Sequence, residues 1–158
     1  MLFRSSLKLA DIGAQMRDPS RLVGLHFFNP VPQMMLVEVV SGTGTDPEWA
    51  RRALAFVRQI DKLPLPTKDT AGFLVNRVLM PYMLNAFRMV DEGLAPETVD
   101  KAAEQFGMPM GPITLADTVG LDICAVVGKQ LVPEAAPPRK LSQLVEAGKL
   151  GKKSGEGF

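Results

Sequence analysis

The sequence has few of the residues that form disulfides and bind metal ions. Its 158 residues include one cysteine, Cys124, and one histidine, His26. A single cysteine excludes an internal disulfide and a cysteine-based metal site, and it fits a reducing compartment. We therefore expect no bound metal and a cytoplasmic protein.

The chain also lacks a strong charge and a long apolar run. Its net charge is +1, and no basic cluster has interleaved aromatic residues, so we expect no nucleic-acid partner. No apolar stretch approaches the roughly 20 residues of a membrane span, and the first four residues turn polar too soon for a signal peptide. Hydrophobic residues make up 46% of the chain, which is ample for a core. These features predict a soluble protein that does not contact a membrane.

Short apolar runs separated by turns fill the first 67 residues. Their spacing and their flanking turn residues predict an α/β unit. The predicted elements are a helix at 7–16, strands at 22–28 and 34–40, a helix that opens at Asp46, and a proline-containing edge strand at 63–66. Two or three strands lack neighbours on at least one edge, so we expect the chain to be incomplete on its N-terminal side.

From Thr70 onward the pattern predicts helices only. The segment 73–90 is apolar on most sides, so this helix must be buried centrally or at a subunit interface. Further helices are predicted at 95–106, from Gly111 through Ile123, and at 140–147.

The most informative motif is His26-Phe27-Phe28-Asn29-Pro30, which contains the lone histidine. Glu38 follows twelve positions after His26, inside the apolar run 34–40. Imidazole titrates near neutral pH, and a carboxylate among hydrophobic residues needs a partner. His26 also stands near the predicted carboxyl end of a strand, where open α/β sheets bind ligands. We predict that Glu38 reaches Nδ1 of His26 and leaves Nε2 for a substrate proton.

Each of these residues also has a structural interpretation. A lone histidine at a strand end is often incidental, and Glu38 is equally compatible with an edge-strand charge that keeps sheets from associating. Asn76 either hydrogen-bonds a neighbouring loop or faces a site. Ser5 is a plain helix N-cap or a binding residue, and Lys153 is solvated or approaches a phosphate. The sequence alone does not separate these alternatives.

The chain closely resembles the NAD-dependent 3-hydroxyacyl-CoA dehydrogenases, from about Ser5 to Phe158, in four motifs that occur in the same order: HFFNPVPQMMLVEVV, KDTAGFLVNRVLMPY, FGMPMGPITLADTVGLD and GKLGKKSGEGF. The helical half is similar to the dehydrogenase part of multifunctional fatty-acid oxidation α-subunits. The resemblance implies a mainly α fold. Residues 1–67 would be the truncated end of a Rossmann-like NAD-binding α/β domain, and residues 68–158 an all-helical C-terminal domain for substrate binding and dimerisation.

The resemblance also implies roles, position by position. His26 matches the catalytic base and Glu38 its carboxylate partner. Ser5 and Asn76 match residues that hydrogen-bond the substrate oxygen, and Ser5, Asn29 and Lys153 match residues that contact NAD. The implied reaction is oxidation of (3S)-3-hydroxyacyl-CoA to 3-oxoacyl-CoA with NAD in fatty-acid β-oxidation. The implied partners are the acyl-CoA substrate, a second copy bound through the helical domain, and other β-oxidation enzymes.

The chain departs from the family's pattern in two places. The phosphate-binding GxGxxG and the acidic ribose ligand, which in the family lie upstream of Ser5, do not occur in these 158 residues. Phe3-Arg4 stand where the family usually has Asn-Thr. We therefore expect a fragment that is inactive alone. Two alternatives are a catalytically inert helical association module that retains the site residues, and an interaction domain whose missing part belongs to another chain.

Overall fold

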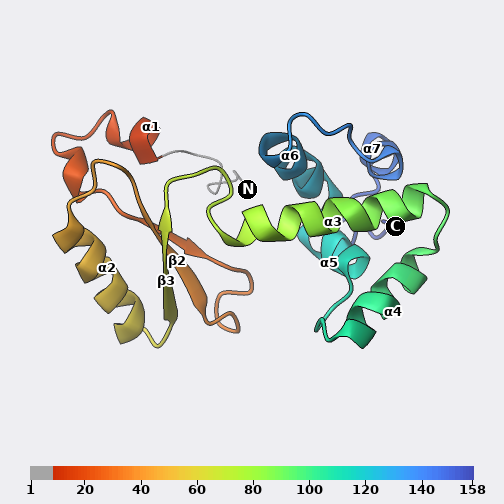
Figure 1. Ribbon diagram of the computed structural model, residues 1–158, viewed down its shortest axis with the longest axis horizontal. Coiled ribbons are helices and arrows are strands. Elements are labelled where there is room, and N and C mark those ends of the chain that lie inside the picture. The colour runs from red at the N-terminus through yellow and green to blue at the C-terminus, as the bar shows by residue number, and fades with distance from the viewer. Residues whose placement is uncertain (1–8) are drawn as a thin grey trace. The chain divides into compact units, whose positions relative to one another are not determined.

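The computed structural model of the chain describes residues 9–158 (Figure 1). It divides into two compact units, Met1–Val75 and Asn76–Phe158. The described part of the first unit contains helices and a sheet, and the second is helical. This is the architecture expected from the sequence, a Rossmann-like α/β start followed by a helical domain.

The first unit is built on a three-stranded sheet in the order β1-β2-β3. β1 is antiparallel to β2, and β2 is parallel to β3. The elements are α1 (Leu9–Gly13), a short 3-10 helix (Pro19–Arg21), β1 (Gly24–Phe27), β2 (Leu36–Ser41), α2 (Pro47–Gln59) and β3 (Leu63–Lys68). β3 lies at an edge of the described sheet, as its two prolines require, because proline has no N–H for a second neighbour.

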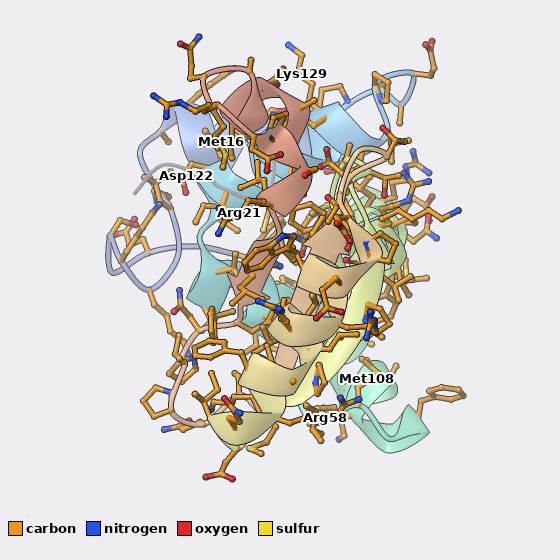
Figure 2. The ribbon with its side chains drawn as sticks, turned by 90° about the vertical axis from the view of Figure 1, so that its left-hand side faces the viewer. Met16, Arg21, Arg58, Met108, Asp122 and Lys129 are labelled. Carbon is orange, nitrogen blue, oxygen red and sulfur yellow. The ribbon has the colours of Figure 1, made fainter. Side chains whose placement is uncertain are left out.

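Helix α2 begins where the sequence predicts. The Asp46 side chain accepts a hydrogen bond from the Glu48 amide at 2.8 Å, and Pro47 occupies the first turn. The helix packs on β2 and β3, and its buried Val57 joins Val37 and Val39 of β2 in one apolar cluster. On its surface Trp49 is flanked by two guanidinium groups. That of Arg21, labelled in Figure 2, lies 4.5 Å from the indole centroid, and that of Arg52 lies 4.8 Å from it.

The second unit packs five helices around one apolar core. They are α3 (Val75–Asp91), α4 (Pro96–Phe106), α5 (Pro112–Val119), α6 (Leu121–Leu131) and α7 (Arg139–Glu146). Figure 1 shows α3 as the longest ribbon of this unit, with α5, α6 and α7 beside it. The inner side chains of α3 are fully or almost fully buried: Met80, Met83, Leu84, Ala86 and Phe87. The helix is not covered all round, because Val78 remains 68% exposed.

The single helix predicted from Gly111 through Ile123 is wrong. The chain breaks at Gly120, which has φ of +111°, a left-handed conformation that favours glycine. This residue ends α5 and begins α6. After α7 the chain closes a small turn through a bridge between Gly151 and Glu156. Over residues 9–158, no helix is both long enough and apolar enough to cross a bilayer.

Candidate active site

His26 and Glu38 face each other across the sheet. They are partners in the antiparallel register of β1 and β2. Nδ1 of His26 lies 2.7 Å from Oε2 of Glu38. The Glu38 side chain is completely buried, whereas the His26 side chain is 22% exposed. Because β2 is the central strand, Glu38 is not a charge on the edge of the described sheet.

The second oxygen of Glu38 holds the chain just before and at the start of α3. Oε1 accepts hydrogen bonds from the amides of Leu74 and Val75, both at 2.9 Å. The preceding residues, Gly72 and Phe73, have φ of +71° and +48°. Two consecutive left-handed residues turn the following N–H groups toward the carboxylate, as in backbone anion sites. The carboxylate of Glu38 therefore accepts three hydrogen bonds, one at Oε2 and two at Oε1.

These contacts set the protonation state of Glu38. Burial alone raises the pKa of the Glu38 carboxyl, but the hydrogen bonds from His26, Val75 and Leu74 outweigh it, and the pKa falls below its ordinary value of 4.5. Glu38 is therefore a carboxylate at neutral pH. A carboxylate only accepts hydrogen bonds, so Nδ1 of His26 is the donor. In the neutral imidazole this leaves Nε2 as an acceptor.

Two aromatic rings lie against the imidazole. The ring of Phe28 is 4.7 Å from it, centroid to centroid, at an interplanar angle of 61°. The ring of Phe73 is 5.5 Å away at 60°. These edge and tilted arrangements are favourable for aromatic pairs. The imidazole therefore lies in an apolar surrounding, with one buried carboxylate and a partly open side.

The predicted cofactor residue Asn29 is exposed in the loop that follows β1. That loop turns through hydrogen bonds from the Gln33 and Met34 amides to the Pro30 carbonyl. The ammonium of Lys62 binds the loop by donating to the carbonyls of Val31 at 2.7 Å and Met34 at 3.0 Å. Sequence reasoning missed Lys62, because a lysine that binds backbone carbonyls leaves no motif in the loop it holds.

Two further predicted residues belong to the second unit. Asn76, partly buried, is the second residue of α3, and Lys153 lies in the turn after α7. Lys153 forms an ion pair with Asp122 in the first turn of α6 (Asp122 is labelled in Figure 2). Burial raises the pKa of Asp122, but the bond to Lys153 and backbone donors lower it below its ordinary value. Ser5 lies outside the described residues.

Asp122 is not among the residues predicted from the sequence, although the sequence carries a signal for it. It stands in the quoted motif FGMPMGPITLADTVGLD, two residues after the glycine at which the helices break. The Leu74 and Val75 amides carry no side-chain signal at all. The one available clue was Gly72, because a glycine just before a helix often marks a left-handed turn.

Comparison with known proteins agrees with this architecture. Residues 4–70 match the family model described as 3-hydroxyacyl-CoA dehydrogenase, NAD binding domain, and residues 72–158 match the model of its C-terminal domain. A probable 3-hydroxyacyl-CoA dehydrogenase of Caenorhabditis elegans is 46% identical over 98% of this chain and 52% of its own length. A fatty acid oxidation complex subunit alpha of Shewanella amazonensis is 40% identical over 98% of this chain and 22% of its own length.

Solved structures give the same result. FadB2 of Mycobacterium tuberculosis is 43% identical, with a TM-score of 0.90 over 98% of this chain and 57% of that chain. The (S)-3-hydroxybutyryl-CoA dehydrogenase PaaH1 of Ralstonia eutropha is 38% identical, with a TM-score of 0.92 over 97% of this chain and 56% of that chain. The chain thus spans about half the length of the C. elegans, M. tuberculosis and R. eutropha relatives. With both family models matched in sequence order, the chain belongs to the 3-hydroxyacyl-CoA dehydrogenase family.

Proposed function

We propose that this chain carries the base of a dehydrogenase that oxidises (3S)-3-hydroxyacyl-CoA to 3-oxoacyl-CoA with NAD in fatty-acid β-oxidation. The observation that carries the proposal is the hydrogen bond from His26 Nδ1 to the buried Glu38 carboxylate, which leaves Nε2 as the acceptor on a partly exposed ring. Removing a hydroxyl proton at neutral pH requires such an acceptor.

His26 and Glu38 divide the work of proton transfer. Nε2 of His26 takes the proton of the substrate 3-hydroxyl, which makes the ring an imidazolium. Glu38 stabilises that cation and keeps Nδ1 as the protonated nitrogen, and a base positioned in this way contributes roughly 10²–10⁴-fold to the rate. A bound NAD would supply the acceptor for the hydride that leaves C3 of the substrate. Ser5 and Asn76 are assigned to hydrogen bonds with the substrate oxygen.

The residues assigned to NAD have suitable chemistry. Asn29 offers an exposed amide that both donates and accepts hydrogen bonds. Lys153 offers an ammonium whose side chain is 43% exposed, which leaves room for a further acceptor beside Asp122. Ser5 is the third assigned contact. We assign residues 1–67 to the NAD-binding domain and residues 68–158 to a substrate-binding and dimerisation domain.

Residues 1–158 contain no GxGxxG motif, which binds the pyrophosphate of NAD. A polypeptide of these residues should therefore bind NAD weakly and be inactive alone. The activity test therefore fuses this chain behind the part of the M. tuberculosis FadB2 chain that precedes the region it matches. The fusion is mixed with (3S)-3-hydroxybutyryl-CoA and NAD, and NADH absorbance is followed, with the (3R) substrate as control. We expect NADH from the (3S) substrate only. A fusion that binds NAD and shows the circular dichroism of a folded protein yet forms no NADH would contradict the proposal.

The proposed partners are the acyl-CoA substrate, a second copy of the chain and other β-oxidation enzymes. Large exposed apolar side chains in the second unit support self-association, among them Phe106 at 90% and Val78 at 68% exposure. The alternative of an inert association module makes a different prediction, because it requires self-association but no NADH formation by the fusion.

A further inference from the structure

One aromatic residue beside His26 has a backbone conformation that bulky side chains rarely adopt. Phe73 has φ of +48°. For a bulky residue such as phenylalanine, such a value is a true outlier, and outliers of this kind concentrate at functional sites. Neighbouring contacts hold it in place: its own N–H donates to the Thr70 carbonyl at 2.9 Å, and the next two amides bind Glu38.

The turn alone does not account for a phenylalanine at this position. A glycine at 73 would adopt the same φ without strain and would still direct the Leu74 and Val75 amides toward Glu38. What glycine lacks is the ring. The Phe73 side chain is only 8% exposed, packs in one apolar cluster with Leu9 and Val40, and lies 5.5 Å from the imidazole of His26.

The imidazole needs such a neighbour because its only hydrogen bond among the described residues is the one from Nδ1 to Glu38. One hydrogen bond does not fix the plane of a ring, which can rotate about the bond that carries it. Rotation would take Nδ1 away from the carboxylate and admit the tautomer with the proton on Nε2. That tautomer cannot accept a substrate proton. Contacts with the rings of Phe28 and Phe73 restrict this rotation.

We propose that Phe73 is a positioning residue for His26: its ring, held in the left-handed turn, fixes the imidazole plane so that Nδ1 stays on Glu38 and Nε2 stays free to accept a proton. The role in catalysis rests on the proposed function, in which His26 is the base. The positioning itself is a property of the chain and is measurable without substrate or NAD.

The single histidine makes the test direct. The full 158-residue chain is labelled with ¹⁵N-histidine, and two-bond ¹H–¹⁵N spectra at about pH 8.5, above the range in which ordinary imidazoles titrate, report the tautomer of His26 alone. The variants are Phe73→Gly and Phe73→Asn, both of which tolerate a left-handed backbone. Phe73→Tyr is the conservative control, and Phe106→Asn is the matched control at an exposed phenylalanine.

We expect the glycine and asparagine variants to retain their circular dichroism and, in a second sample labelled uniformly with ¹⁵N, the amide signals of Leu74 and Val75. The share of the Nε2–H tautomer should rise roughly 2- to 10-fold, because the interaction energy of one aromatic pair changes an equilibrium constant by about that factor. The tyrosine variant and the Phe106 control should match the wild type.

An unchanged tautomer in both folded variants would overturn the proposal. Loss of the Leu74 and Val75 amide bonds together with the tautomer change would also overturn it, because the turn and not the ring would then be responsible. If both variants unfold, Phe73 is a stability residue and the proposal is wrong. Failure of the fusion enzyme to form NADH would overturn the proposed function but leave this result standing.

Discussion

His26 and Glu38 occupy opposing positions on antiparallel strands, so the strand register itself determines which carboxylate meets the imidazole. A slip of one residue would turn Glu38 to the other face of the sheet and bring Val37 or Val39 opposite His26. Both valines are almost completely buried in the core, which makes such a slip costly. The packing that stabilises the first unit therefore also assembles the proposed base and its partner.

Replacing Glu38 by Gln should impair the fusion enzyme through the tautomer of His26. The glutamine oxygen can still accept from Leu74 and Val75, but its NH₂ group would then face Nδ1 and favour the tautomer with the proton on Nε2. We expect kcat to fall by about 10²–10⁴-fold, with KM for the acyl-CoA little changed. His26→Ala should cost more, since it removes the base. A Glu38→Gln variant that is the slower of the two would show that the roles are wrongly assigned.

Glu38 should also make the fold sensitive to acid. Its pKa lies below the ordinary 4.5 because the hydrogen bonds from His26, Val75 and Leu74 outweigh the effect of burial. A depressed carboxyl pKa contributes stability that is complete above the unfolded-state pKa and is lost as the pH falls through the folded-state pKa. The urea midpoint of the wild type should therefore drop below about pH 4.5, and that of Glu38→Gln should drop less steeply. The exposed Glu134→Gln serves as control and should follow the wild type.

Cys124 should resist thiol reagents until the second unit opens. The side chain is 1% exposed, and burial, with smaller effects from Asp122 and Asp117, raises the pKa of the thiol to about 12. Because the thiolate is the reactive form, its share at neutral pH should be about 1,000-fold lower than in the unfolded chain. Labelling by an aromatic disulfide reagent, with and without urea, measures the difference. Native labelling as fast as denatured labelling would show that the α6 core is open.

Lys153 and its neighbour Lys152 offer a matched pair for testing the cofactor assignment. Lys153→Met should raise KM for NAD in the fusion enzyme about 10-fold or more, the effect of losing one hydrogen bond to a charged group. Lys152→Met changes the net charge equally and should leave KM for NAD near the wild-type value. Equal effects of both substitutions would indicate a general electrostatic effect and not a specific contact.

The chain should self-associate at low micromolar concentration. Apolar side chains such as Val78 and Phe106 are exposed on the second unit, and closed homodimers are the commonest way to cover surfaces of this kind. Light scattering should report at least a dimer for residues 1–158, and removal of residues 1–67 should preserve it. A clean monomer from both polypeptides would eliminate the dimer from the proposal.

Local patterns in the sequence predicted most of the helices and strands, because their start signals are side chains. Asp46 and Pro47 mark the start of α2, and the alternating prolines of β3 place that strand at an edge. The sequence did not predict the break at Gly120. Apolar residues continue at helical spacing on both sides of it, so one residue with positive φ does not interrupt the hydrophobic pattern.

The site was only partly predictable for a similar reason. The pairing of His26 with Glu38 was predictable because a carboxylate among hydrophobic residues needs a hydrogen-bond donor, and the imidazole can supply one. The amides that complete the carboxylate's coordination belong to the backbone, and any sequence offers amides. Only the turn at Gly72 and Phe73 selects those of Leu74 and Val75, and a phenylalanine at positive φ contradicts its ordinary preference.

Lys62 binds the loop after Asn29 only through main-chain oxygens. Every amino acid carries such an oxygen, so the attachment does not depend on which side chains occupy positions 31–34. Val31 and Met34 are 39% and 40% exposed in this loop. Substitution at either position can change the exposed surface of the loop while its backbone keeps its path. The fold therefore allows the exposed side chains of this loop to diversify during evolution without loss of the contacts that hold its backbone.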